Sequence, residues 1–449
     1  MRYLPHTDEE IREMLARIGV PTIDALFETI PEDRRFKGRL PIEPALDEAS
    51  LMRHLTELAA KNVGSEMLSF LGGGAYAHHI PPAVDQLLLR SEFYTAYTPY
   101  QPELSQGTLQ AIFEFQTLVC ELFGMEVANA SMYDGASAAA EAALMAGRIT
   151  RRTRVVASAG LHPHVLETIR GYVMGLGDGG VLELVPVDET GRTRADALAA
   201  AVDGTTAAVI LGYPNFFGVV EDLRAAKAVC AEKGALLVSV TLEPYALSLV
   251  EAPGKLGVDV AVGEGQALAV PPQFGGPGVG LFACKNEHLR QMPGRLCGET
   301  VDQEGKRGFV LTLSTREQHI RRERATSNIC TNHGLIALAM TIRTAMLGRR
   351  GFEEAGRRCL AAAEYLKGRL ARVPGVSLPF SGPTFNEFVV RFEDETAASV
   401  VGRLEQDGIL AGIDLGRFDP ARAHELLVAV TELHKREDLD RLVDAIARR

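Results

Sequence analysis

A polar and aromatic segment at residues 97–107 carries side chains suited to binding. It reads YTPYQPELSQG, and its two prolines restrict the backbone. Four side chains supply hydrogen-bonding groups: Tyr97, Tyr100, Gln101 and Glu103. A linker packed between two lobes needs no such set. We therefore expect the segment to contact a ligand or another subunit, and the alternative is a turn whose polar groups satisfy one another.

A second segment, NASMYDGAS at 129–137, links a predicted strand to a helix of small residues at 138–146. Small side chains and free backbone N–H groups at a helix N-terminus favour phosphate binding. Asp134 and Ser137 lie in this turn. The alternative is that Asp134 only caps the helix.

Charges concentrate in residues 293–332, PGRLCGETVDQEGKRGFVLTLSTREQHIRRERATSNICTN. Such a run is usually a solvated surface, but here the apolar stretch 308–311 interrupts it. It ends in the polar cluster Thr326, Ser327 and Asn328. Because this cluster precedes a predicted helix, its hydroxyl and amide groups are candidates for binding an anion.

Two adjacent histidines, His78 and His79, follow a triple glycine. Histidine pairs bind metals, but no third ligand recurs at a usual spacing, so we predict no metal site and favour a role at a loop interface. The six cysteines are scattered without a CxxC pair, which indicates reduced thiols in a cytoplasmic protein. The N-terminus has neither an apolar signal core nor an Arg/Ser-rich transit pattern, which favours the same location.

The elements that must position these residues begin with a helical arm at residues 1–65. Thr7 and Glu10 form a capping-box pattern, apolar residues then recur at helical spacing, and Gly19 ends the helix. Two further helices are predicted at 23–27 and 47–61. Such an arm either wraps a partner subunit or caps its own chain.

A large α/β lobe is predicted at 66–335 and a small α+β lobe at 336–449. Apolar strands that alternate with helices indicate a doubly wound, mostly parallel sheet covered on both faces. The predicted strands of the large lobe are 127–133, 154–158, 181–187, 207–212, 236–240, 258–262 and 279–284. Elsewhere we predict helices at 108–121, 338–347, 397–407 and 436–448, and strands at 385–392 and 425–431.

Composition excludes several classes of function. The chain has 449 residues, 46% of them hydrophobic, which is enough for a large core in two or more lobes. A net charge of −11 argues against a nucleic-acid partner. No apolar run approaches the roughly 20 residues needed to span a bilayer.

The run GEGQALAVPPQFGGPGVG at 263–280 resembles the turn on which pyridoxal-phosphate (PLP) enzymes of the aminotransferase fold, fold type I, carry the lysine that binds their cofactor. Gln266 stands at that point, and an amide cannot form the imine. The next lysine, Lys285, lies beyond the glycine-rich turn and cannot take the place of the missing lysine unless a strand moves. The same resemblance implies that the cofactor phosphate would meet the turn at 129–137.

Two further residues match this fold by position. His162 corresponds to a residue that stacks on the cofactor ring, and Glu243 to an acid at the pyridine nitrogen. Each could instead be an ordinary loop residue. Taken with Gln266, they imply a cofactor pocket that survives in outline only.

Over nearly its whole length, the chain resembles the P-protein family of the glycine cleavage system, glycine dehydrogenase (decarboxylating). The resemblance is greatest to subunit 1, the N-terminal-half (α) subunit found where this oxidoreductase is split over two chains. It rests on long and rare blocks: SFLGGGAYAHHIPPAV, YTPYQPELSQGTLQ, NASMYDGASAAAEA, YPNFFGVVED, the run at 263–280 and GFVLTLSTREQHIRRERATSNICTN. Glu243 departs from the aspartate more common in the family.

The resemblance implies a partner. The second subunit carries the lysine and the PLP, and the two chains pair as αβ, usually doubled to α2β2. Glycine loses CO2 on PLP, and the aminomethyl group passes to the lipoyl arm of H-protein.

On this basis we hypothesise that the chain completes the partner's site in trans. Tyr97, Tyr100, Thr326, Ser327 and Asn328 would line it, the last three near the cofactor phosphate, with His78 and His79 at its mouth. The rivals are a self-sufficient PLP enzyme and a non-catalytic scaffold or regulatory pseudoenzyme.

Overall fold

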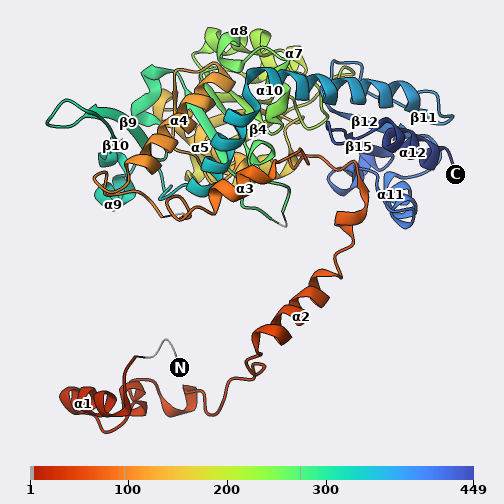
Figure 1. Cartoon of the computed structure of the whole chain (residues 1–449). Helices are drawn as coiled ribbons and strands as arrows, with labels where there is room; N and C mark the ends of the chain where they lie inside the picture. The colour runs from red at the N-terminus through yellow and green to blue at the C-terminus, as the bar shows by residue number, and fades with distance from the viewer. Residues whose placement is uncertain (1–4, 96, 274, 449) are drawn as a thin grey trace. The chain divides into compact units, whose positions relative to one another are not determined.

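The structure, a computed structural model, describes residues 5–95, 97–273 and 275–448. The chain divides into two units, Met1–Val63 and Gly64–Arg449. Figure 1 shows both units, coloured along the chain. The division of the second unit into lobes at residue 335 stays a prediction.

The described residues of the first unit form two α-helices, α1 (Asp8–Ile18) and α2 (Glu48–Ala59). The capping box at the start of α1 is confirmed, since Thr7 and Glu10 bond reciprocally, and Gly19 ends the helix with a φ of 87°. The predicted second helix is only a 3-10 turn, η1 (Asp24–Phe27), followed by another, η2 (Glu32–Arg34). Leu15 is the one buried residue among the described residues of this unit.

A seven-stranded sheet forms the centre of the second unit, in the order β2-β8-β7-β6-β5-β3-β4. Five neighbouring strands are parallel, while β8 runs antiparallel to both β7 and β2, so the sheet is mixed. Its strands are β2 (Val127–Ala128), β3 (Arg154–Ser158), β4 (Val181–Val185), β5 (Thr206–Gly212), β6 (Leu236–Thr241), β7 (Val260–Glu264) and β8 (Gly280–Cys284). The strand predicted at 127–133 stops at Ala128, and only Met132 pairs again, as an isolated bridge to Gly280.

Helices cover both faces of this sheet, as the apolar strands predicted. Val155 and Ala157 of β3 belong to the core cluster that includes α5 and α6, whereas Val156 belongs to the cluster that includes α4, α8 and α10 on the other face. The helices of this unit are α3 (Pro82–Leu88), α4 (Gln106–Phe123), α5 (Gly135–Thr150), α6 (Pro163–Met174), α7 (Ala195–Ala201), α8 (Leu223–Lys233), α9 (Gln318–Arg321), α10 (Gly334–Leu370), α11 (Ala397–Gln406) and α12 (Arg436–Ala447). None of the described helices is both long and apolar enough to cross a membrane.

A smaller four-stranded sheet has the order β11-β12-β15-β14. Its strands are β11 (Val376–Ser377), β12 (Glu387–Phe392), β14 (Ile413–Asp414) and β15 (Glu425–Ala429). They pack with α11, α12 and the C-terminal half of α10. Figure 1 shows α10 extending from beside α4 to this sheet, and the helix breaks at Gly348, where φ is 62°. A parallel pair, β1 (Leu68–Ser69) and β13 (Ile409–Leu410), joins the start of this unit to the same region.

The charged run at 293–332 folds in a way that the sequence did not predict. Its first half is an antiparallel hairpin of β9 (Leu296–Val301) and β10 (Arg307–Thr312). Short helical turns follow, up to the start of α10 at Gly334. The charges therefore lie on a hairpin and on short helical turns rather than along one long helix.

Candidate functional site

A cleft of about 490 Å³ lies at the carboxyl end of the central strands. Ligands of open α/β sheets bind at this edge. The cleft is lined by the head of α5, the turn after β7, the glycine-rich turn at 275–278 and the segment 73–75. Asp134, His162 and Gln266, which were predicted separately, all reach this cleft.

The head of α5 is closed by a capping box. The Asp134 carboxylate accepts the N–H of Ser137 at 2.7 Å, and the Ser137 hydroxyl accepts the N–H of Asp134 at 3.3 Å. The capping alternative for Asp134 therefore describes its contacts in this chain.

Glu264, the last residue of β7, is bonded to three backbone N–H groups. Its carboxylate accepts from Gly135 at 2.9 Å, from Gln266 at 2.9 Å and from Val279 at 2.8 Å. Burial raises the pKa of Glu264 to about 7, against the opposing effect of these donors. Sequence reasoning missed this residue, although it stands two positions from Gln266.

Gln266 begins the turn that follows β7, and its side chain is 8% exposed. Its amide nitrogen donates to the carbonyl of Val270. The side chain is thus held in the wall of the cleft, and it has no amine to offer.

His162 caps α6 and binds the glycine-rich segment. Its Nδ1 accepts the N–H of His164 at 3.1 Å, so Nε2 carries the proton and donates to the carbonyl of Gly73 at 2.8 Å. The imidazole lies edge-on to Phe216, with ring centroids 4.8 Å apart. Burial lowers the pKa of His162 to about 4, so the ring is neutral at physiological pH.

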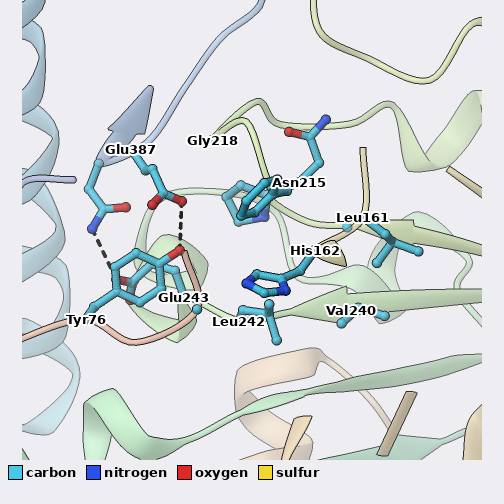
Figure 2. Close-up of a pocket in the computed structure, with 14 residues that line it drawn as sticks. Tyr76, Leu161, His162, Asn215, Gly218, Val240, Leu242, Glu243 and Glu387 are labelled. Atoms are coloured by element: carbon cyan, nitrogen blue, oxygen red, sulfur yellow. Dashed lines mark hydrogen bonds between the residues drawn. The ribbon is translucent and has the colours of Figure 1, made fainter. Parts of the chain in front are cut away.

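Glu243 lines a separate small cavity beside the cleft, shown in Figure 2 with Tyr76, His162 and Glu387. Its carboxylate accepts from Asn386 Nδ2 at 3.1 Å and from the N–H of Tyr245 at 3.0 Å. It also bonds to His78 Nε2 at 3.1 Å. These three contacts hold the Glu243 carboxylate in the wall of the small cavity.

His78 is buried, which differs from the expected place on a loop interface. Its other nitrogen, Nδ1, lies 2.6 Å from Glu432, and its ring stacks on Tyr245 with centroids 4.0 Å apart. Burial lowers the pKa of His78, but the Glu243 and Glu432 carboxylates outweigh this effect and raise it to about 9. His79 is exposed, and its N–H donates to Glu432 at 2.9 Å.

Folding brings two further metal-ligand side chains to His78, Cys359 and Glu432. These groups are already bonded to one another, since the Cys359 thiol lies 3.5 Å from the Glu432 carboxylate. Burial raises the pKa of the Cys359 thiol, which therefore keeps its proton. The contacts describe a hydrogen-bonded cluster, and no metal site is inferred from them.

The two polar segments predicted to bind are brought together by Arg295. Tyr97 and Tyr100 are 78% and 51% exposed, and their rings meet edge-on at 6.1 Å. The buried Arg295 donates to the Tyr100 hydroxyl at 2.7 Å and lies over its ring at 5.2 Å.

Arg295 also lies near the second polar segment, Thr326–Asn328, through its contact with Glu317. Arg295 Nε lies 3.6 Å from Glu317, and Glu317 lines a small pocket with Thr326 and Ser327. The cluster Thr326–Asn328 does not sit at a helix N-terminus as predicted, because α10 begins only at Gly334. Its hydroxyls belong to irregular backbone, with Thr326 and Ser327 half-buried and Asn328 exposed.

Comparison with known proteins shows to which protein family the chain belongs. The family model of the glycine cleavage system P-protein matches residues 1–446. The chain belongs to the glycine cleavage system P-protein family.

The sequences of individual P-protein relatives align with this chain over nearly its whole length. A probable glycine dehydrogenase (decarboxylating) subunit 1 of Sorangium cellulosum is 62% identical over 451 residues, covering 100% of this chain and 99% of the relative. A protein of the same name from Anaeromyxobacter dehalogenans is 53% identical, covering 99% of this chain and 100% of its own length. The recognition made from the sequence blocks is thereby confirmed.

Solved structures confirm the fold. An inhibitor-bound glycine decarboxylase (P-protein) of the glycine cleavage system superposes with a TM-score of 0.90 at 42% identity, covering 100% of this chain and 99% of that one. A Burkholderia pseudomallei sphingosine-1-phosphate lyase, at 17% identity and a TM-score of 0.68, shares the fold alone, covering 91% and 92% of the two chains. This P-protein family chain therefore has the fold type I architecture of PLP-dependent enzymes.

Proposed function

We propose that this chain is the subunit of a two-chain P-protein that holds no covalent cofactor and completes the glycine-decarboxylating site of its partner in trans. The observation that carries the proposal is Gln266. Its amide side chain stands in the turn after β7, where the fold's cofactor lysine is expected, and donates to Val270. These residues do not fit a covalently held PLP.

In this proposal, PLP bound in the partner supplies the electron sink for loss of CO2 from glycine. The present chain supplies side chains that enclose and orient the substrate. The exposed rings of Tyr97 and Tyr100 support this role, because Arg295 donates to the Tyr100 hydroxyl while the tyrosine stays 51% exposed.

Thr326, Ser327 and Asn328 are proposed to reach the partner's cofactor phosphate. Their hydroxyl and amide groups suit an anion, and Thr326 and Ser327 line a small pocket with Glu317, which lies 3.6 Å from Arg295. His79 is exposed, and we propose that it lies at the mouth of the partner's site. His78 is buried, so its part is to brace the segment that carries His79.

Relatives named as subunit 1 support a second chain, which we propose to be the PLP-bearing subunit, in an α2β2 assembly that also receives the lipoyl arm of H-protein. Decarboxylation is then measurable as exchange of bicarbonate carbon into glycine, first with each chain alone and then with the pair. Activity should need both chains. Equal activity of the complementary chain alone would favour the scaffold alternative.

Replacing Thr326 and Ser327 by alanine tests the in-trans contact directly. We expect PLP to dissociate from the two-chain complex roughly tenfold faster or more, because hydrogen bonds to a charged group contribute about 1.5–3 kcal/mol each. Cofactor retention is measured by absorbance after gel filtration. Ser399→Ala, on the exposed face of α11, is the control and should retain PLP. Unchanged retention and turnover in the double variant would refute the role of this segment.

A further inference from the structure

Two carboxylates occupy the helix head where a PLP enzyme of this fold would bind the cofactor phosphate. Of the first three N–H groups of α5, that of Gly135 donates to Glu264 and that of Ser137 donates to Asp134. A phosphate dianion would have to displace these bonds. It would also meet the oxygen atoms of both carboxyl groups, which do not donate hydrogen bonds to an anion when ionised.

Glu264 is fixed in this position by more than one contact. Its second oxygen accepts the N–H groups of Gln266 and Val279, so the carboxylate joins the ends of β7 and β8 to α5. The space around it is also filled, because a Cβ added to Gly135 would lie 3.1 Å from Glu264 Cβ. The carboxylate is therefore a structural part of the cleft wall.

The imidazole of His162 is likewise in contact with the glycine-rich segment at Gly73 and Gly74. A Cβ added to Gly74 would lie 3.7 Å from His162 Cδ2, and one added to Gly73 would lie 3.9 Å from Nε2. The φ values of Gly73 and Gly74 are 62° and 94°, a backbone conformation that favours glycine. With the bond from Nε2 to the Gly73 carbonyl, the imidazole serves the segment 73–74.

Glu243 is the last of the residues that match a cofactor contact by position. Its carboxylate is shared between His78, Asn386 and the N–H of Tyr245, and it is 3% exposed. Each residue that matches a cofactor contact by position is thus bonded to atoms of this chain.

We infer that the cleft of this chain is closed to phosphorylated pyridoxal by its own side chains, and that the Glu264 carboxyl group stands in the place of the cofactor phosphate. The missing lysine is then one of several changes, and restoring it alone does not restore a cofactor site. The inference goes beyond the role in trans, because it concerns what this chain's own cleft accepts.

The test supplies the amine at position 266 with and without the Glu264 carboxyl group. Full-length Gln266→Lys and the double variant Gln266→Lys/Glu264→Ala are each incubated with PLP or with pyridoxal, which lacks the phosphate, and then reduced with borohydride. Peptide mass spectrometry measures the label at position 266 and separates it from label on surface lysines. The ratio of PLP to pyridoxal labelling at position 266, divided by the same ratio at surface lysines, reports the phosphate contact, because free pyridoxal also closes to a less reactive hemiacetal.

We expect Gln266→Lys to show a ratio near one. The double variant should prefer PLP by about tenfold or more, equivalent to about 1.4 kcal/mol. A clear PLP preference in Gln266→Lys alone would show that the helix head is open and would overturn the inference. A folded double variant without that preference would overturn the assignment to Glu264.

The variant Gln266→Lys/Glu264→Gln keeps the shape of the side chain at position 264. It replaces the alanine variant in this test if circular dichroism shows that the alanine variant does not fold. The unmodified chain gives a third measurement, because inorganic phosphate should neither bind to it in calorimetry nor raise its Tm. Since all these measurements use the isolated chain, their outcome is independent of the two-chain assay.

Discussion

His78 is a histidine whose charge depends on its neighbours. In the folded chain its pKa is about 9, compared with 6.5 for a free side chain, because Glu243 and Glu432 flank it. A group whose pKa is raised by folding stabilises the fold fully below its unfolded pKa, and this contribution is lost as the pH rises through the folded value. The contribution of His78 is therefore complete below pH 6.5 and disappears near pH 9.

Replacing His78 by glutamine should therefore change how stability depends on pH. The free energy of unfolding of the wild type should exceed that of His78→Gln at pH 6.5, and the difference should shrink by on the order of 3 kcal/mol by pH 9. Urea unfolding of the isolated chain measures it. His54→Gln, at an exposed position in α2, is the control. A difference that stays constant across this range would contradict the charged pair.

Arg295 acts on the proposed site through Tyr100, by one hydrogen bond and one ring contact. Tyr100→Phe removes the hydroxyl, and Arg295→Lys keeps a charge beside Glu317 but loses the planar guanidinium. We expect each variant to lower bicarbonate exchange by the two-chain complex. The double variant should fall short of additivity by about 1 kcal/mol, because both changes remove one contact.

Tyr94→Phe is the control for this cycle, since Tyr94 is 62% exposed and near the same segment in sequence. It should leave exchange within roughly twofold of the wild type, as expected of a surface substitution. Additive effects of Tyr100→Phe and Arg295→Lys would mean that the arginine does not work through the tyrosine.

At the scale of elements, α1 has an apolar stripe without a core of its own. Met14 and Ile18 are 41% and 60% exposed, and farther along the same unit Phe27 and Phe36 are 50% and 64% exposed. Exposed apolar side chains gathered in one segment mark an interaction site. We propose that this unit covers the partner subunit, while a cap on its own chain remains the alternative from the sequence.

The double variant Met14→Ser/Ile18→Ser distinguishes these possibilities. If the helix covers the partner, the affinity of the two chains should fall on the order of tenfold or more, because each buried side chain contributes about 1.5–3 kcal/mol. The Tm of the isolated chain should not change. The control, Glu13→Ser/Arg17→Ser, changes exposed polar positions of α1. A lower Tm of the isolated chain with unchanged affinity would favour the cap.

At the scale of the second unit, buried carboxylates join the glycine-rich segment to the small sheet. Glu387 of β12 accepts the N–H of Gly73 at 2.7 Å and the hydroxyl of Tyr76 at 2.8 Å, as Figure 2 shows for the tyrosine. Burial raises the pKa of Glu387 to about 8. The native state thus binds this proton more tightly than the unfolded chain, so rising pH above the unfolded value of 4.5 reduces stability.

Glu387→Gln removes this titration and keeps a carbonyl acceptor. We expect the wild type to lose stability relative to the variant as the pH rises from 4.5 to about 8. The slope should be on the order of 1 kcal/mol per pH unit. Guanidinium unfolding at several pH values measures the difference. Parallel curves for the two proteins would contradict a buried, protonated Glu387.

The sequence predicted most of the local structure correctly. Capping at Thr7 and Glu10, the strand at 154–158 and the helices near 397–407 and 436–448 follow from patterns within a few residues. It failed at 293–332, where a hairpin formed, because the charges there carry no strand period. It also overextended the strand at 127–133, where the backbone turns toward the head of α5.

By itself, the sequence determined the family, the alternation that builds the sheet, and the absence of an amine at Gln266, because these are properties of residue identity and short-range order. Only the tertiary structure decided the surroundings of Glu264, His78 and Arg295. Their partners lie 129, 354 and 195 positions away in the chain for Gly135, Glu432 and Tyr100 respectively. Burial and pairing at such separations depend on how the strands and helices stack, which no local pattern of residues records.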